Sequence, residues 1–394
     1  MQGTGQTTVR REDGRTEGSR PGPLLGGTTE RKLQRMGAVT VGVSLPREWV
    51  GQRGLAVGST IRLTSRSDGA LVLLDRSPVS EVRRAILEVA PTTTSEHLFR
   101  DLIGAYLTGA SEFDVRVPGG ITPEVRATVR TFVRRTIQPE IVSEEGESIV
   151  LRDVSLGTFL PVPSLIRRMY QVVRDIQADA GRCWTPGDER RQPVLESMDD
   201  EIDRYAWLVE RVLALHGWAG VPERENDARG EDPLGDLLVA RYLERIGDHA
   251  VLIEQHGLRL REANIPRNVV DSLTDYHAQV LAHLKDAFEV SQRGDVARAN
   301  EVIDTGQALR ATREALSENL LYNGGQPRIA TAAHASLSLL LESIDRTTAY
   351  AQDIGEVGLD RGAARRVLRQ KRSTPPVTPA PPSVQVHHGS ARRP

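Results

Sequence analysis

The chain has 394 residues, which is enough for two or three domains, and 39% hydrophobic and 26% charged residues are typical of a globular protein. Its net charge of −2 excludes a whole-molecule attraction for nucleic acid, so any DNA contact needs a local basic patch. The single cysteine, Cys183, excludes a disulfide framework and a cysteine-based metal site within one chain and favours a reducing cytoplasm.

Both ends of the chain are predicted to be disordered. Residues 1–29 contain almost no large apolar side chains, and residues 371–394 are rich in proline, so neither end can bury enough surface to fold. No apolar run approaches the roughly 20 residues of a membrane span, and the first residues lack the apolar region of a secretory signal. We therefore expect a cytoplasmic protein without stable membrane insertion.

Residues 30–77 are predicted to form a small strand-rich domain. Alternating apolar residues predict strands in AVTVGVSL and TIRLTSR, and the strand ALVLLDR follows the turn signal Asp68-Gly69. Pro46 and Gly54 bracket one short helix between these strands.

Residues 80–156 are predicted to form a mixed α/β connecting region. Helices are expected in SEHLFRDLIGAYLTGA and TPEVRATVRTFVRRTI, a strand in FDVRVP and a hairpin in PEIVSEEGESIVLRDV.

An internal repeat organises the helical remainder of the chain. LERIGDHAVLIEQ aligns with IDRTTAYAQDIGE at an offset of 101 residues, from Glu244 to Asp345, and the same offset aligns DDEIDRYAWL with NEVIDTGQAL. Each repeat has room for three long helices, at roughly 160–182, 190–217 and 233–261, and then at 266–292, 295–320 and 327–357. The fold class is therefore multidomain α+β, ending in two tandem three-helix bundles at 158–265 and 266–362.

Two acidic pairs in the first bundle are the candidate functional residues. Asp199 and Asp203 are four residues apart, as are Glu244 and Asp248, so each pair lies on one face of its helix. Like charges at this spacing repel, and a bound cation would remove the repulsion if the two pairs face each other. The sequence therefore predicts a metal site of carboxylate oxygens, with the choice among Fe, Mn, Mg and Zn left open.

The alternative is that these acids are solvated and paired with the nearby Arg204 and Arg245. The second repeat has an incomplete set of acids, so its site is expected to be weak or lost. Its equivalent positions are Asn300, Asp304, Asp345 and Ala349. No serine–histidine–aspartate, P-loop, GxGxxG or CxxC signature is present, so we expect no enzyme activity.

MDDEIDRYAWLVERVL and ARYLERIGDHAVLIEQ, within tandem three-helix repeats, resemble the PhoU family of phosphate-uptake regulators over about 160–362. In that family paired E/D-x-x-x-D motifs bind metal clusters on the bundle surface. The resemblance implies this role for Asp199, Asp203, Glu244 and Asp248. It implies a second, weaker site at Asp304 and Asp345.

The segment SLPREWVGQRGLAVGSTIRL resembles the core of an AbrB/SpoVT-type swapped-hairpin domain, which implies a homodimer. Together the two modules are similar to archaeal PhoU-type transcriptional regulators. Ala38, Val50 and Gly51 stand where AbrB-type DNA binders carry basic residues. DNA phosphates would therefore meet other cations, chiefly Arg31, Lys32, Arg35 and Arg47.

The function expected from these observations is phosphate-responsive regulation of phosphate uptake. The N-terminal module would bind promoter DNA. The metal-binding helical half would sense phosphate status, alone or by contact with a phosphate ABC transporter ATPase or another phosphate-signalling protein. Two alternatives stay open: a PhoU-like adaptor that binds only protein, and a metalloenzyme acting on phosphorylated compounds.

Overall fold

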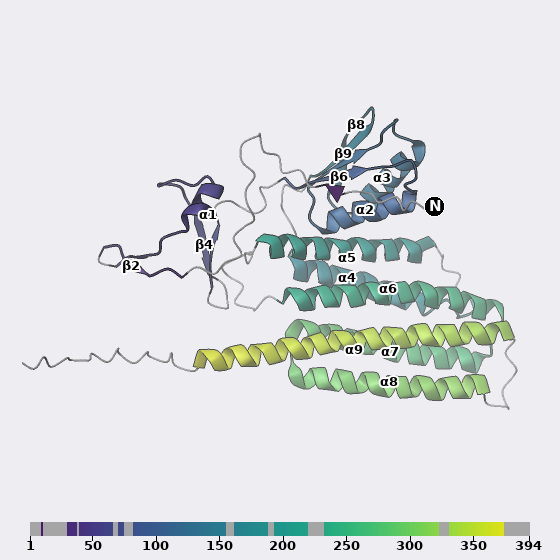
Figure 1. Cartoon of the computed structure of the whole chain (residues 1–394). Helices are drawn as coiled ribbons and strands as arrows, with labels where there is room; N and C mark the ends of the chain where they lie inside the picture. Colours follow the sequence, from purple (N-terminus) through teal and green to yellow (C-terminus); the bar gives the residue numbers. More distant parts are fainter. Residues whose placement is uncertain are drawn as a thin grey trace, which may run out of the picture.

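The computed structural model describes residues 9–10, 30–37, 39–65, 70–74, 82–154, 161–187, 193–219, 232–322 and 331–373 (Figure 1). The predicted Asp68-Gly69 turn and nearly all of both predicted disordered ends lie outside these ranges. None of the helices within them combines the length and apolarity that a membrane span requires.

The N-terminal module consists of two separate antiparallel hairpins and a short helix. Its elements are β2 (Gln34–Arg35), β3 (Val41–Gly42), α1 (Arg47–Gln52), β4 (Arg62–Ser65) and β5 (Leu71–Leu74). β2 pairs with β3 and β4 pairs with β5, and the two sheets do not join. The short predicted helix is present, as are strands in each of the three predicted segments.

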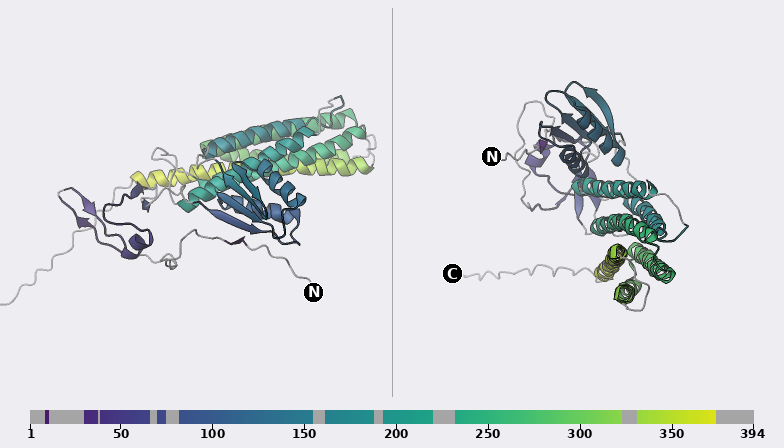
Figure 2. Two further views of the ribbon diagram at one scale, coloured as in Figure 1. Left: turned by 90° about the horizontal axis from the view of Figure 1, so that it is seen from above. Right: turned by 90° about the vertical axis from the view of Figure 1, so that its right-hand side faces the viewer.

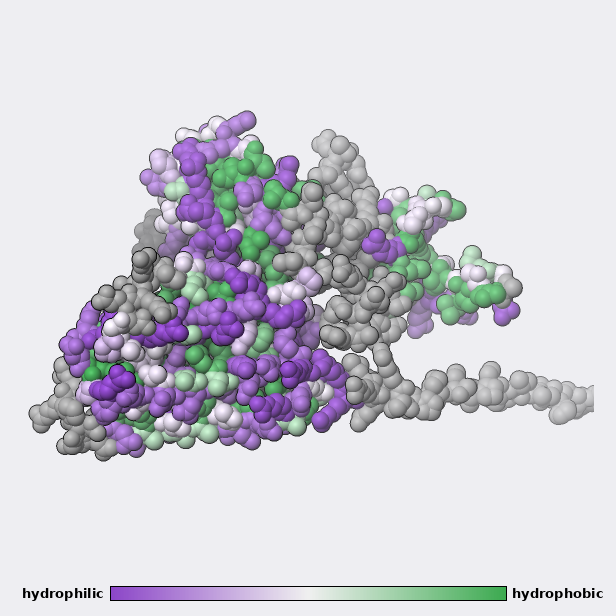
Figure 3. Space-filling view, turned by 180° about the vertical axis from the view of Figure 1, so that it is seen from behind, coloured by the Kyte–Doolittle hydropathy of each residue, from purple (hydrophilic) through white to green (hydrophobic). Residues whose placement is uncertain are grey.

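Apolar side chains on these hairpins are exposed, as the space-filling view shows (Figure 3). Val39 is 93% exposed and Leu63 is 58% exposed, and none of the residues in 30–74 whose burial is described is buried. Isolated two-stranded hairpins are marginally stable in water. A second chain covering these faces would supply the missing core, which keeps the swapped-hairpin homodimer as a prediction.

The connecting region is a five-stranded sheet with two helices. Its elements are β1 (Val9–Arg10), β6 (Arg84–Glu88), α2 (Ser95–Leu107), β7 (Glu112–Arg116), α3 (Pro123–Arg135), β8 (Pro139–Glu145) and β9 (Ser148–Asp153). The strand order is β1-β6-β7-β9-β8, and only β6 and β7 are parallel. Both helices begin at threonine caps, Thr94 and Thr122, and the sheet and helices share a core around Phe113 and Phe132.

One part of the predicted N-terminal disorder is wrong. Val9 and Arg10 form β1, which pairs antiparallel with Leu87 and Ile86 of β6. The edge of a sheet presents unpaired backbone groups that even a short extended segment can satisfy, whatever its composition.

Six long helices form the remainder of the described chain, close to the predicted ranges except that the last one extends further. They are α4 (Val162–Ala180), α5 (Pro193–Ala219), α6 (Pro233–Glu262), α7 (Arg267–Arg293), α8 (Val296–Tyr322) and α9 (Thr331–Ser373). Helices α4, α5 and α6 pack against one another, as do α7, α8 and α9, and α6 lies along α9 (Figure 2). One continuous hydrophobic core runs through both groups.

Positions one repeat apart meet where α6 crosses α9. The rings of His249 and Tyr350, which are 101 residues apart, have centroids 5.9 Å from each other. Gln177 donates to the carbonyl of Ile246 at 2.8 Å and contacts the hydroxyl of Thr347 at 3.3 Å, and these two partners are again 101 residues apart. The two repeats therefore face each other across this helix pair.

The last helix is longer than predicted, because α9 continues to Ser373 and so includes the first three residues of the predicted C-terminal tail. Arg361 of α9 links this helix to α6 and α7. It contacts Asp232 at 2.9 Å and Asp236 at 2.5 Å at the start of α6, and the carbonyl of Ser291 in α7 at 2.8 Å. Alanine and arginine after Gly362 favour a helix, and residues 363–374 contain no proline that would end it.

The sheet region sits on the bundle through α2 and α3, which contact α5 (Figure 1). Arg211 of α5 is only 1% exposed and reaches into this interface. It donates to the carbonyls of Tyr106 at 2.6 Å and Ala110 at 2.8 Å, and to Asp153 Oδ2 at 2.9 Å. This contact positions the end of α3 beside the acidic face of α5.

Candidate functional site

The four predicted acids lie on two helices that pack directly against each other. Asp199 and Asp203 are on α5, and Glu244 and Asp248 are on α6. Gly247 makes the close approach possible: a Cβ atom there would lie 2.8 Å from Ile202 Cδ1 and 3.3 Å from Asp199 Oδ1. We call these four carboxylates the acidic cluster.

The carboxylates of the acidic cluster act on one another. Burial, followed by the charges of Asp203 and Asp248, raises the pKa of Asp199 to about 7. Burial, followed by the charge of Asp248, also raises the pKa of Glu244. Asp199 Oδ1 and Glu244 Oε2 are buried without a hydrogen-bond partner, and burying such atoms is costly. The cluster is therefore a half-buried site with unsatisfied negative charge.

An arginine from the sheet region, Arg135, partly neutralises the cluster. Its Nη2 lies 2.8 Å from Asp203 Oδ2 and 2.9 Å from Asp200 Oδ1, and its guanidinium lies 5.8 Å from the Phe99 ring and 5.5 Å from the Trp207 ring. Burial raises the pKa of Asp203, and the charge of Arg135 opposes that rise. Arg135 is at the end of α3, 68 residues before Asp203, and no spacing rule links the two positions.

On α6, Arg245 also partly neutralises the cluster. This agrees with the alternative interpretation, in which the acids pair with nearby arginines. It lies 3.4 Å from Glu244 Oε2 and 3.3 Å from Asp248 Oδ2, without satisfying the Glu244 oxygen by a hydrogen bond. Burial raises the pKa of Asp248, and Arg245 opposes the rise. The other expected partner, Arg204, makes no ion pair with an acid in the part of the chain that the structure describes; it lines a pocket instead.

The donor chemistry of the cluster suits a cation, since two buried carboxylate oxygens lack hydrogen-bond partners and burial together with the neighbouring acids raises the pKa of Asp199. Across the described residues, no three His, Cys, Asp or Glu side chains stand ready to hold a metal ion in this arrangement. A cation would need carboxylate rotations that release Arg135 and Arg245. A metal ion would therefore compete with these two arginines for the same carboxylates.

The second-repeat acids have different surroundings. Asp304 of α8 is exposed, whereas Asp345 of α9 is half-buried, with Oδ1 unpartnered. Burial raises the pKa of Asp345, and the strongest charges acting on it are those of Arg313 and Arg310, not of Asp304. The structure thus gives Asp345 arginine neighbours and does not place Asp304 among its main charge partners.

The residues predicted to contact DNA are all on the surface of the N-terminal module. Arg31, Lys32, Arg35 and Arg47 are each exposed, the first three at β2 and the last at the start of α1. They are available to a ligand, and DNA binding stays a prediction.

Comparisons with known proteins find similarity in the helical half. Residues 166–255 match the PhoU domain family, and this range contains all four residues of the acidic cluster. A phosphate-specific transport system accessory protein PhoU homolog of Caulobacter vibrioides, found in two strains, is 28% identical over 172 residues, which span 43% of this chain and 68% of that protein. The crystal structure of PhoU from Pseudomonas aeruginosa superimposes with a TM-score of 0.45 at 19% identity, covering 52% of this chain and 96% of that one.

The match over residues 166–255 supports the resemblance of these helical segments to the PhoU family. The likeness of the N-terminal module to AbrB/SpoVT-type domains stays a prediction.

Proposed function

We propose that this chain is an accessory regulator of phosphate transport and that it acts as a protein-binding adaptor. The observation that carries the proposal is the PhoU domain match over residues 166–255. The Caulobacter relative, named as an accessory protein of the phosphate-specific transport system, supports the same role. Its partner would be a component of the phosphate transport system, such as the transporter ATPase. Because the family match lies in the helical half, it favours the adaptor over the promoter-binding regulator.

Gene deletion with complementation tests the proposal. A host that lacks the chain should lose the normal repression of phosphate uptake at high phosphate, and the wild-type gene should restore it. A variant with Arg31, Lys32, Arg35 and Arg47 all changed to glutamine should restore repression equally, because an adaptor does not need these exposed cations. Phosphate uptake in deletion and complemented strains is the measurement.

Two outcomes would contradict this adaptor role. Unchanged uptake in the deletion strain would remove the role in phosphate transport. Failure of the glutamine variant, if it is present at the wild-type level, would favour promoter binding instead. A gel shift with the upstream region of the gene would then show salt-sensitive binding by the wild type only.

We further propose that the acidic cluster binds a divalent or iron ion through Asp199, Asp203, Glu244 and Asp248. The ion would supply the positive charge that the paired carboxylates lack. Support comes from the two unpartnered buried oxygens and from the raised pKa of Asp199. The carboxylates would hold the ion, while Arg135 and Arg245 would turn to other partners.

An Asp248→Ala variant should lose the bound metal. One of four ligands is removed, so the remaining three would bind an ion at least tenfold more weakly. A tenfold loss of affinity corresponds to about 1.4 kcal/mol of binding free energy. Metal content after dialysis against a fixed free-ion concentration is the measurement. Asp271→Ala is the matched control, because Asp271 is an exposed acid of α7 paired with Arg267 at 2.9 Å. Equal metal in the wild type and Asp248→Ala would show that the ion does not bind at this cluster.

A further inference from the structure

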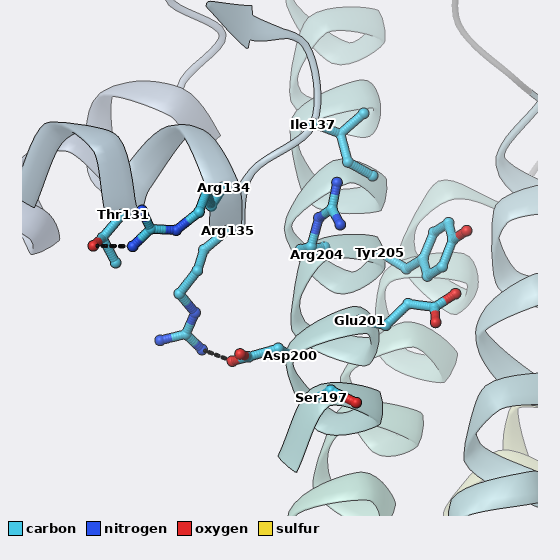
Figure 4. A pocket seen from close by; sticks show the side chains of 9 residues that line it. All are labelled: Thr131, Arg134, Arg135, Ile137, Ser197, Asp200, Glu201, Arg204 and Tyr205. Carbon is cyan, nitrogen blue, oxygen red and sulfur yellow. Dashed lines mark hydrogen bonds and ion pairs between the residues drawn. The ribbon is translucent and has the colours of Figure 1, made fainter. Parts of the chain in front are cut away.

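A pocket of about 480 Å³ lies between α3 and α5, beside the acidic cluster (Figure 4). This volume lies within the range of small-molecule sites, roughly 300–1,000 Å³. Three of its lining residues are arginines: Arg134 and Arg135 of α3 and Arg204 of α5. Side-chain hydroxyls of Thr131, Ser197 and Tyr205 also line it, so the walls offer hydrogen-bond donors from both elements.

The acids of this pocket are already paired. Asp200 Oδ1 lies 2.9 Å from Arg135, and Glu201 Oε1 lies 2.9 Å from Arg168, which is outside the lining. Two guanidinium groups remain, because within the described residues no carboxylate pairs with Arg134 or Arg204. Arg134 contacts the Thr131 hydroxyl at 2.9 Å, and the Nε of Arg204 is buried without a hydrogen-bond partner. An anion in the pocket would contact both arginines if Arg134 turned from Thr131 toward Arg204 (Figure 4).

We propose that this pocket binds a small organic phosphate, with the phosphate group on Arg134, Arg204 and Arg135 and the organic part against Ile137 and Tyr205. Guanidinium groups match the geometry of phosphate oxygens and bind them in pairs of hydrogen bonds. Inorganic phosphate alone would fill only a small part of the cavity and would make no contact with its apolar wall. The lining thus assigns the phosphate to the arginines of α3 and α5 and the organic part to the apolar wall.

Arg135 links this pocket to the acidic cluster. It holds Asp203 and Asp200 at present, so only part of its hydrogen-bonding capacity is available to an anion. A cation on Asp203 would displace Arg135, which could then turn fully toward the phosphate. This step rests on the cation site proposed above. Because coupling between two ligands is reciprocal, the organic phosphate would in turn strengthen cation binding.

Titration calorimetry on the full chain, with AMP as the probe, tests the pocket. AMP should bind to the wild type. Arg204→Gln should weaken AMP binding about tenfold or more, and Arg134→Gln should do the same, although Arg134 is more exposed than Arg204. Arg130→Gln is the matched control, because Arg130 is an exposed arginine of α3 outside the lining, and its affinity should equal that of the wild type. The pocket assignment is wrong if AMP does not bind, if both lining variants bind it normally, or if inorganic phosphate binds as tightly.

The coupling has a separate test with Mn²⁺, whose binding is measured by metal analysis. Mn²⁺ should tighten AMP binding at least fivefold in the wild type and leave it unchanged in Asp248→Ala, which controls for direct complexes between Mn²⁺ and AMP. If Mn²⁺ binds and AMP affinity stays the same, the coupling is wrong and the cation site stands. If AMP binds and Mn²⁺ does not, the cation site is wrong and the pocket stands.

Discussion

Replacing Arg211 by methionine should lower the free energy of unfolding by about 3–5 kcal/mol, the cost of breaking a buried ion pair by removing one partner. The methionine would fill much of the space but would remove the hydrogen bonds that Arg211 donates to Asp153 and to the carbonyls of Tyr106 and Ala110. The side chain of Asp153 is only 8% exposed, so water would do little to replace the Arg211 charge. Urea denaturation of the two proteins measures the difference.

Two further variants sharpen the Arg211 experiment. Arg174→Met removes an exposed arginine of α4 that pairs with its neighbour Asp175, and it should change stability by less than about 1 kcal/mol. Adding Asp153→Leu to Arg211→Met should recover part of the loss, because the buried Asp153 charge is then removed together with its Arg211 partner. A loss below about 1 kcal/mol in Arg211→Met would show that this contact does not hold the sheet region on the bundle.

In the metal-free protein, Asp199→Asn should stabilise the fold at pH 8 and have little effect near pH 4. The pKa of Asp199 is about 7 in the folded chain, whereas its ordinary value is 3.8, so between these limits the folded state binds more protons than the unfolded state. Stability from this group is complete below pH 4 and is lost as the pH rises through 7. Asparagine cannot ionise, so the variant avoids this loss of stability. Solvent screening limits the loss in the wild type to about 1–2 kcal/mol.

Thermal unfolding after chelation, at pH 5 and pH 8, measures this effect. Asp271→Asn is the control. Because Asp271 is exposed, this substitution should shift the midpoint of thermal unfolding equally at both pH values. Added metal should reverse the order, since an ion that binds only the folded wild type stabilises it by mass action. A difference between wild type and Asp199→Asn that does not change with pH would contradict a strained carboxylate at this position.

The sequence alone determined what depends on local pattern. The spacing of apolar residues predicted the six long helices, the 101-residue offset revealed the repeat, and the i, i+4 spacing placed each acidic pair on one helix face. These features were accessible because helical periodicity is a property of neighbouring residues.

Only the tertiary structure decided which groups from distant segments meet. Arg135 reaches the acidic cluster because Arg211 seats the sheet region on α5, and the pocket between α3 and α5 exists for the same reason. Likewise, Val9 and Arg10 add a strand to an edge that their own composition does not predict. Ion pairs, edge pairing and cavities depend on how elements pack, and packing depends on summed contacts across the whole chain rather than on any local spacing.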